Sequence, residues 1–161
     1  MKHLFLVRHA KSSWADESLS DRERPLNTRG ISQLAPLGNA LKSVGAFEGE
    51  VYSSNAKRAV ATLQGILPDT VAAERCHTLS ELYTFDYRRL LAWLEEQAKA
   101  PQITLVGHNP ALLELAQSLL KQPPEQLPTA SVIHIRLSIK HWRQIGRGKG
   151  KLVTLVTPQD Y

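Results

Sequence analysis

Several common features are missing from the 161-residue sequence, and each absence excludes a class of protein. A single cysteine, Cys76, cannot form an internal disulfide, which is typical of a reducing compartment. Near the amino terminus only Leu4 to Val7 form an apolar run before Arg8. Four residues are too few for a signal-peptide core or a membrane span. We therefore expect a soluble, cytoplasmic protein with no membrane partner.

The sequence also has no cluster of His, Cys and Asp residues at the spacing of metal ligands, so we expect neither a metal nor another cofactor. Apolar residues make up 42% of the chain, which is enough for a globular interior. The length fits one core. We therefore interpret residues 1–161 as a single domain, and nothing in the sequence requires more than a monomer.

Positive charge is concentrated near the carboxyl end, although the formal net charge is only +5. A stretch without acids carries Lys140, Arg143, Arg147, Lys149 and Lys151, separated by glycines. Such a stretch could bind nucleic acid or an acidic protein. It lacks the interleaved aromatics of a single-strand binding surface, so we interpret it as a flexible, solvated hairpin tip and expect no nucleic-acid partner.

Strands and helices alternate along the sequence, with a long polar loop over residues 10–27. Helical spacing of apolar residues predicts helices over 28–44, 56–67, 87–99 and 111–120, with Pro36 expected to kink or delay the first. Apolar runs predict strands over 3–7, 51–53, 71–78, 103–106, 132–137 and 152–156. The last two could close the sheet as an antiparallel pair. This alternation predicts an α/β fold: three layers, with a mainly parallel sheet flanked by helices on both faces.

Two of the predicted strands end in a histidine. Arg8 and His9 follow the first strand, and His108 follows the strand over 103–106. Ligands of open α/β sheets bind at the carboxyl ends of the strands. The sequence therefore predicts one site in which two imidazoles face a common ligand.

A second arginine is expected at the same edge. Arg58 falls in the first turn of the helix that follows the strand at 51–53, where it can point past the strand end. Guanidinium groups match phosphate oxygens, and the two fixed cations Arg8 and Arg58 would keep a nearby imidazole neutral and nucleophilic. The pattern favours phosphoryl transfer through a phosphorylated histidine, without a metal.

These residues belong to a series of motifs that extends over nearly the whole chain. In order they are Arg8-His9-Ala10-Lys11-Ser12, Asp21 with Arg24-Pro25-Leu26-Asn27 and Gly30, Ser53-Ser54 with Arg58 and Thr62, Leu82-Tyr83, Val106-Gly107-His108-Asn109-Pro110, and Leu127-Pro128-Thr129-Ala130. The series resembles the histidine phosphatase, or phosphoglycerate mutase-like, superfamily, and above all its small SixA-type phosphohistidine phosphatase branch.

The resemblance implies a role for each matching residue. His9 would be the nucleophile that is transiently phosphorylated, and Arg8, Arg58 and His108 would hold the phosphoryl group. Ser12, from the first motif, is expected to assist in substrate binding. The superfamily usually adds an acidic proton donor between the positions of Arg58 and His108. Glu81 is the nearest match, and Asp21 and Asp86 are rivals.

Two departures from the wider superfamily affect the expected substrate. Ala10 replaces the usual glycine, as is common in the small branch. The stretch between Arg58 and His108 is short, so the resemblance implies a fold without a large cap insertion and an open site. An open site suits a phosphoryl group carried on another protein, whereas a small sugar phosphate would profit from enclosure.

The leading hypothesis is a phosphatase that hydrolyses phosphohistidine on a protein partner, such as a histidine phosphotransfer domain of a signalling relay. A phosphomonoesterase acting on small phosphoesters or other phosphoproteins with the same site is the alternative. A third hypothesis, from a different class, is a non-catalytic module that binds through its basic stretch. An imidazole leaves easily once it is protonated, whereas an alkoxide needs a well-placed acid, which favours the first hypothesis.

Overall fold

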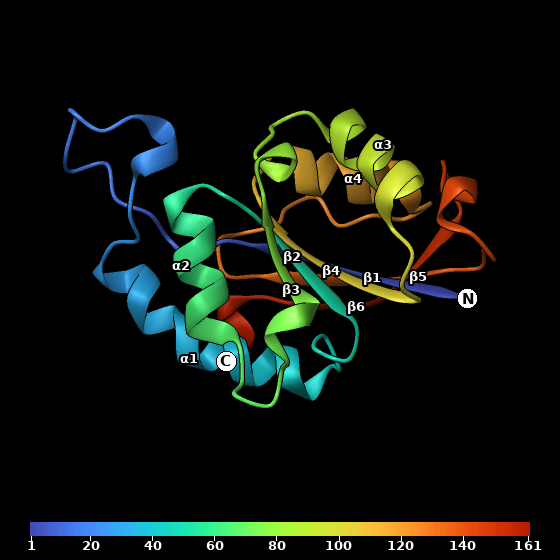
Figure 1. Ribbon diagram of the computed structural model, residues 1–161, viewed down its shortest axis with the longest axis horizontal. Helices are drawn as coiled ribbons and strands as arrows, with labels where there is room; N and C mark the ends of the chain where they lie inside the picture. Colours follow the sequence, from blue (N-terminus) through green and yellow to red (C-terminus); the bar gives the residue numbers. More distant parts are fainter.

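A computed structural model describes residues 1–161 as one six-stranded sheet between two layers of helices (Figure 1). The strand order in the sheet is β3-β2-β4-β1-β5-β6. Strands β3, β2, β4 and β1 run parallel, whereas β5 is antiparallel to both β1 and β6. The bounds are β1 Lys2–Arg8, β2 Glu50–Ser54, β3 Cys76–Leu79, β4 Gln102–Gly107, β5 Val132–Leu137 and β6 Gly150–Val156. The predicted fold, including the antiparallel pair at its edge, is confirmed.

Strand β1 is buried on both sides because helices cover both faces of the sheet. Phe5 and Val7 point to the face covered by α1 (Thr28–Ser43) and α2 (Lys57–Ile66). Leu4 and Leu6 point to the face covered by α3 (Tyr87–Gln97) and α4 (Ala111–Leu119). Figure 1 shows the two helical pairs on opposite sides of the strands. None of the helices is long and apolar enough to cross a membrane.

Two elements differ from the sequence prediction. Helix α1 begins at Thr28 and continues through Pro36, so the proline does not delay it. A proline removes the hydrogen bond to the carbonyl four residues earlier, and that residue, Ser32, is exposed, so water can satisfy its carbonyl. The strand expected over 71–78 is only β3, because Ala73–Arg75 form a 3-10 turn that delays the extended backbone.

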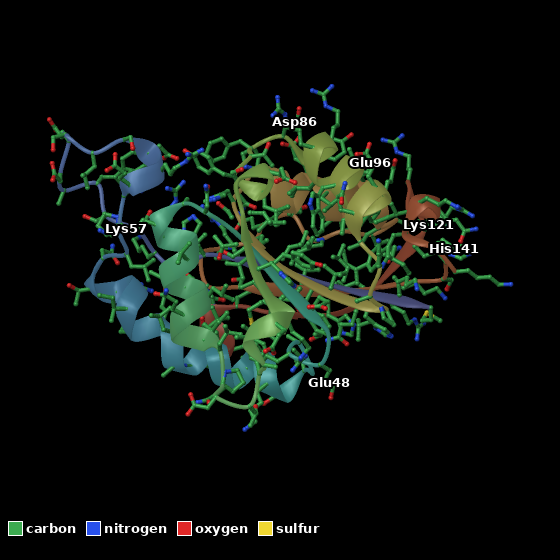
Figure 2. All side chains as sticks on the ribbon, viewed as in Figure 1. Glu48, Lys57, Asp86, Glu96, Lys121 and His141 are labelled. Carbon is green, nitrogen blue, oxygen red and sulfur yellow. The ribbon has the colours of Figure 1, made fainter.

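The basic stretch joins the antiparallel strands β5 and β6, as expected of a hairpin connection. Unlike the expected flexible tip, it contains a short helix and a buried side chain. Trp142, in a short 3-10 helix, is buried, and its Nε1 donates a hydrogen bond to the Ala100 carbonyl at 2.7 Å. Figure 2 places His141 at the right-hand end of the molecule and Lys57, the first residue of α2, at the left. The basic stretch therefore lies far from the start of α2.

The loop between β1 and α1 is held in place by a close approach of two backbones. The Asn27 N–H donates to the Lys11 carbonyl at 3.0 Å, and the Asn27 side chain caps α1 by accepting from the Gly30 N–H. A Cβ atom at Gly30 would lie 2.0 Å from the Lys11 carbonyl oxygen. In Figure 1 this loop, in blue, extends beyond the end of β1 toward the start of α2. Only glycine allows the loop to approach α1 this closely.

We predict that Gly30→Ala lowers the free energy of unfolding by about 1–3 kcal/mol, because the new methyl group overlaps a backbone oxygen that must then move. Urea denaturation followed by circular dichroism measures the change. Gly146→Ala is the matched control, since a Cβ at Gly146 meets nothing within 4 Å. Equal stabilities of the two variants would show that the loop yields without cost.

Candidate active site

A cavity of about 440 Å³ opens at the carboxyl ends of β1 and β4, beside the start of α2. Its floor is formed by buried side chains that include His9, Arg58 and His108, whereas its rim is exposed. The full lining is Arg8, His9, Lys11, Ser12, Trp14, Asp21, Arg24, Arg58, Phe85, His108, Asn109 and Thr129. The structure thus brings together the two histidines and two arginines that lie at the ends of β1 and β4 and at the start of α2.

His9 directly follows β1, and its ring is held in one tautomer. Its Nδ1 lies 2.7 Å from the Ala10 carbonyl oxygen, which can only accept a hydrogen bond, so Nδ1 carries the proton. The lone pair is therefore on Nε2, which lies 3.4 Å from Arg58 Nε. Burial first, and then the charges of Arg58 and Arg8, lower the pKa of His9 to about 4. The ring is neutral near pH 7 and its Nε2 is available as a nucleophile.

His108 follows β4, and its ring centre lies 5.2 Å from that of His9. Its Nε2 is 2.8 Å from Ser54 Oγ, which itself accepts a hydrogen bond from the Ala56 N–H. The Ser54 hydroxyl can therefore donate to Nε2, which leaves the imidazole proton on Nδ1. Burial, and then the neighbouring His9 and Arg58, lower the pKa of His108 to about 3.

Two buried nitrogen atoms of the site have no partner in the protein. These are Nδ1 of His108 and Nε of Arg8, whose terminal amino group donates to the Leu127 carbonyl at 3.0 Å. Buried polar groups normally have a hydrogen-bond partner. An anion with several oxygen atoms, such as a phosphoryl group, has acceptors for such donors.

Arg58 is oriented by Asp21, which lies in the loop between β1 and α1. Both terminal nitrogens of Arg58 donate to Asp21, one to its carbonyl at 2.6 Å and one to its carboxylate at 3.0 Å. The carboxylate also accepts from Arg24 at 3.1 Å and from the Tyr83 hydroxyl at 2.5 Å. This leaves Arg58 Nε facing His9. An arginine side chain that is only 3% exposed is thereby fixed against the His9 ring.

The acids that the sequence offered as proton donors lie in three different settings. Although burial raises the pKa of Asp21, hydrogen bonds from Tyr83, Arg58 and Arg24 hold it at about 2, so this carboxylate stays ionised near neutral pH. Glu81 is exposed on a 3-10 turn, Ser80–Leu82, and lies outside the cavity lining. Asp86 caps α3, binds Arg88, and sits at the outer surface in Figure 2. Of the three, only Asp21 lines the cavity, and its carboxylate is ionised.

Other lining residues divide into those within the sequence motifs and those outside them. Ser12 lines the cavity, and its hydroxyl accepts a hydrogen bond from Arg24 at 2.6 Å, so it helps to hold the Arg24 side chain in place. The sequence motifs also contain four lining residues for which the resemblance implies no separate role: Lys11, Arg24, Asn109 and Thr129. Trp14 and Phe85 belong to no motif, because isolated aromatics in two distant loops form no pattern. No group of three or more His, Cys, Asp or Glu side chains is arranged to hold a metal ion.

The chain is similar to known proteins in family, sequence and structure. Residues 4–89 match the model of the histidine phosphatase superfamily (branch 1). An uncharacterized chloroplastic protein of Arabidopsis thaliana is 29% identical over 173 residues, which cover 99% of this chain and 79% of that protein.

Two similar structures have the same fold. The SixA protein of Agrobacterium tumefaciens, a proposed phosphohistidine phosphatase, superposes with a TM-score of 0.79 at 20% identity, covering 98% of both chains. The protein histidine phosphatase SixA complexed with tungstate superposes with a TM-score of 0.75 at 22% identity, also covering 98% of both chains. The expected architecture, without a large cap insertion, is confirmed.

We predict that the protein loses stability as the pH falls from about 6.5 toward 4. His108 has a pKa near 6.5 when unfolded and about 3 when folded, so in this window only the unfolded chain binds the proton. The same sign holds for His9, with a folded pKa of about 4. Urea midpoints at pH 7, 6 and 5 measure the slope, which should be shallower in His108→Gln. An identical slope in this variant would contradict the neutral buried state of His108.

We also predict that Asp21→Asn lowers the free energy of unfolding by about 1–3 kcal/mol, because buried Arg58 loses its counter-charge. The loss falls short of that for a fully buried pair, since the Asp21 side chain is 39% exposed. Asp86→Asn is the control, because its partner Arg88 is 75% exposed and such pairs contribute little.

Inorganic phosphate should raise the melting temperature of Asp21→Asn more than that of the wild type, since phosphate can replace the missing carboxylate beside Arg58. Differential scanning fluorimetry over a phosphate titration, with chloride at matched ionic strength, makes the comparison. Equal shifts of the melting temperature in both proteins would mean that phosphate and Asp21 do not compete for the same hydrogen-bond donors of Arg58.

Proposed function

The chain belongs to the histidine phosphatase superfamily, and we propose that it is a phosphatase that hydrolyses phosphohistidine on a protein partner through a phosphorylated His9. The observation that carries the proposal is the state of His9: a neutral ring whose unprotonated Nε2 accepts a 3.4 Å hydrogen bond from Arg58 Nε in a cationic cavity. Such a group can attack phosphorus near pH 7, because its lone pair is not taken by a proton.

The reaction has two displacement steps. His9 Nε2 attacks the phosphorus atom as the bond to the substrate imidazole breaks, and the bonding electron pair stays with that imidazole, which leaves neutral if its other nitrogen is protonated. Water then attacks phosphorus, releasing inorganic phosphate and restoring His9. In both steps charge spreads over three phosphoryl oxygens, which Arg8, Arg58 and His108 would stabilise.

The preference for phosphohistidine is supported by the positions of the acids. An alkyl phosphoester leaves as a poor alkoxide unless an acid protonates it, whereas a protonated imidazole leaves without such help. Asp21 is ionised, and Glu81 and Asp86 lie outside the cavity lining, so we assign none of them a proton-donor role. The names of the similar SixA structures support the same substrate class.

The carrier of the phosphohistidine would be another protein, such as a histidine phosphotransfer domain. The open rim of the cavity supports a large substrate, because a small one gains more from enclosure. We further propose that residues 1–161 act as one histidine phosphatase domain, as a monomer and without a metal ion. A cytoplasmic location stays a prediction.

The test compares hydrolysis of a phosphohistidine-bearing protein with that of a panel of small phosphoesters and phosphoserine peptides. We expect phosphohistidine to be the preferred substrate and a rapid quench to trap acid-labile, base-stable phosphate on His9, located by mass spectrometry. His9→Ala should lose turnover and the trapped phosphate, while its circular dichroism spectrum is retained.

His141→Ala is the matched control, because His141 is an exposed histidine at the far end of the molecule (Figure 2). It should keep wild-type turnover. A strong preference for esters would overturn the substrate assignment, and turnover by His9→Ala would overturn the nucleophile.

A further inference from the structure

Two aromatic side chains stand at the rim of a cavity that is otherwise polar. Trp14 and Phe85 are the only apolar residues in its lining, and they are 75% and 46% exposed. The remaining exposed lining residue is the cation Lys11. Exposed aromatics beside a binding cavity are typical of positions where a partner supplies the missing contact.

Phe85 is held in place by its neighbours although half of it is exposed. Its ring packs edge-on against Tyr83, with centres 5.7 Å apart, and against His108, with centres 5.6 Å apart. It also lines a neighbouring hollow of about 400 Å³ with residues of α3 and α4. Phe85 therefore forms a fixed wall on one side of the mouth of the cavity.

Trp14 lies in the loop between β1 and α1 and is positioned by a cation. The guanidinium carbon of Arg24 lies 3.3 Å from the centre of the Trp14 ring, and Arg24 is itself buried and bound to Asp21. Its high exposure leaves most of the indole open. Trp14 and Phe85 thus come from distant parts of the chain. Each packs against a residue that donates a hydrogen bond to Asp21, the residue that orients Arg58.

We propose that Trp14 and Phe85 recognise the aromatic ring of the leaving group, which makes the site specific for a phosphoryl group bonded to an imidazole. This proposal rests on the proposed function. The two residues are specificity-determining and take no part in bond making or breaking.

The geometry of displacement supports this assignment. The attacking and leaving atoms lie roughly in line through phosphorus, so a nucleophile on the floor directs the leaving group toward the mouth. The rings of His9, His108 and Phe85 follow one another at spacings of 5.2 and 5.6 Å from the floor to the rim. A ring leaving from phosphorus would emerge beside Phe85, where an aromatic face attracts a neutral or a cationic imidazole.

Four substrates separate the effect of an aromatic ring in the leaving group from the effect of the bond type, P–N or P–O. Phosphohistidine and phosphoramidate both have a P–N bond, but only the first has a ring. Phenyl phosphate and ethyl phosphate make the same comparison for a P–O bond. In Phe85→Ala and Trp14→Ala we expect the ratio of kcat/KM with and without the ring to fall about three- to tenfold, the range of one aromatic pair.

Two further variants separate recognition from damage to the fold. Phe85→Tyr keeps the ring and should keep the ratio, whereas Phe85→Leu keeps apolar bulk only and should lose it. Val153→Ala, at an exposed apolar position on β6, is expected to leave all four activities unchanged. A misplaced His108 would lower all four activities together and leave the ratios intact.

Binding gives a second measurement that needs no turnover. The wild type should bind phenylphosphonate more tightly than methylphosphonate by a similar factor, and Phe85→Ala should lose this preference. Unchanged ratios in both alanine variants, with an unchanged phosphonate preference, would overturn the inference. Faster hydrolysis of P–O than of P–N substrates at equal ring content would instead overturn the proposed function and leave ring recognition standing.

Discussion

The carboxylate of Asp21 is the interaction on which the arrangement of the cavity depends. It joins the loop after β1, the first turn of α2 and the segment after β3 through hydrogen bonds to Arg24, Arg58 and Tyr83. A buried guanidinium without a counter-charge would be costly, so the ion pair fixes Arg58 as well as neutralising it. The direction of Arg58 Nε toward His9 follows from this anchor.

The same cations explain the electrostatics of the two imidazoles. Burial disfavours the charged form of His9 and His108, and the neighbouring arginine charges add to the effect. The arginines that would attract an anion therefore also keep both imidazoles unprotonated. The negative charge of Asp21 raises the pKa of His108, but burial and the neighbouring His9 and Arg58 outweigh it.

The sheet and the convergence of Arg8, His9, Arg58 and His108 could be predicted, because buried strands have local apolar patterns and the carboxyl ends of parallel strands share one edge. The proton donor could not be assigned from the sequence. Whether Glu81 or Asp21 lies at the cavity depends on how their loops fold, and no local sequence pattern shows this. Trp14 and Phe85 were missed for the same reason. Contacts between distant loops are set by tertiary packing, which leaves no periodic signal in either segment.

The place of β1 in the sheet has a consequence for how this site could change over time. β1 is hydrogen-bonded to β4 on one side and to β5 on the other, so we expect the backbone leading to His9 to be among the last parts of the molecule to open. Trp14 and Phe85 lie in connecting segments, where substitution is tolerated best. Mutations at Trp14 and Phe85 could therefore change which molecules bind, while the arrangement around His9 stays unchanged.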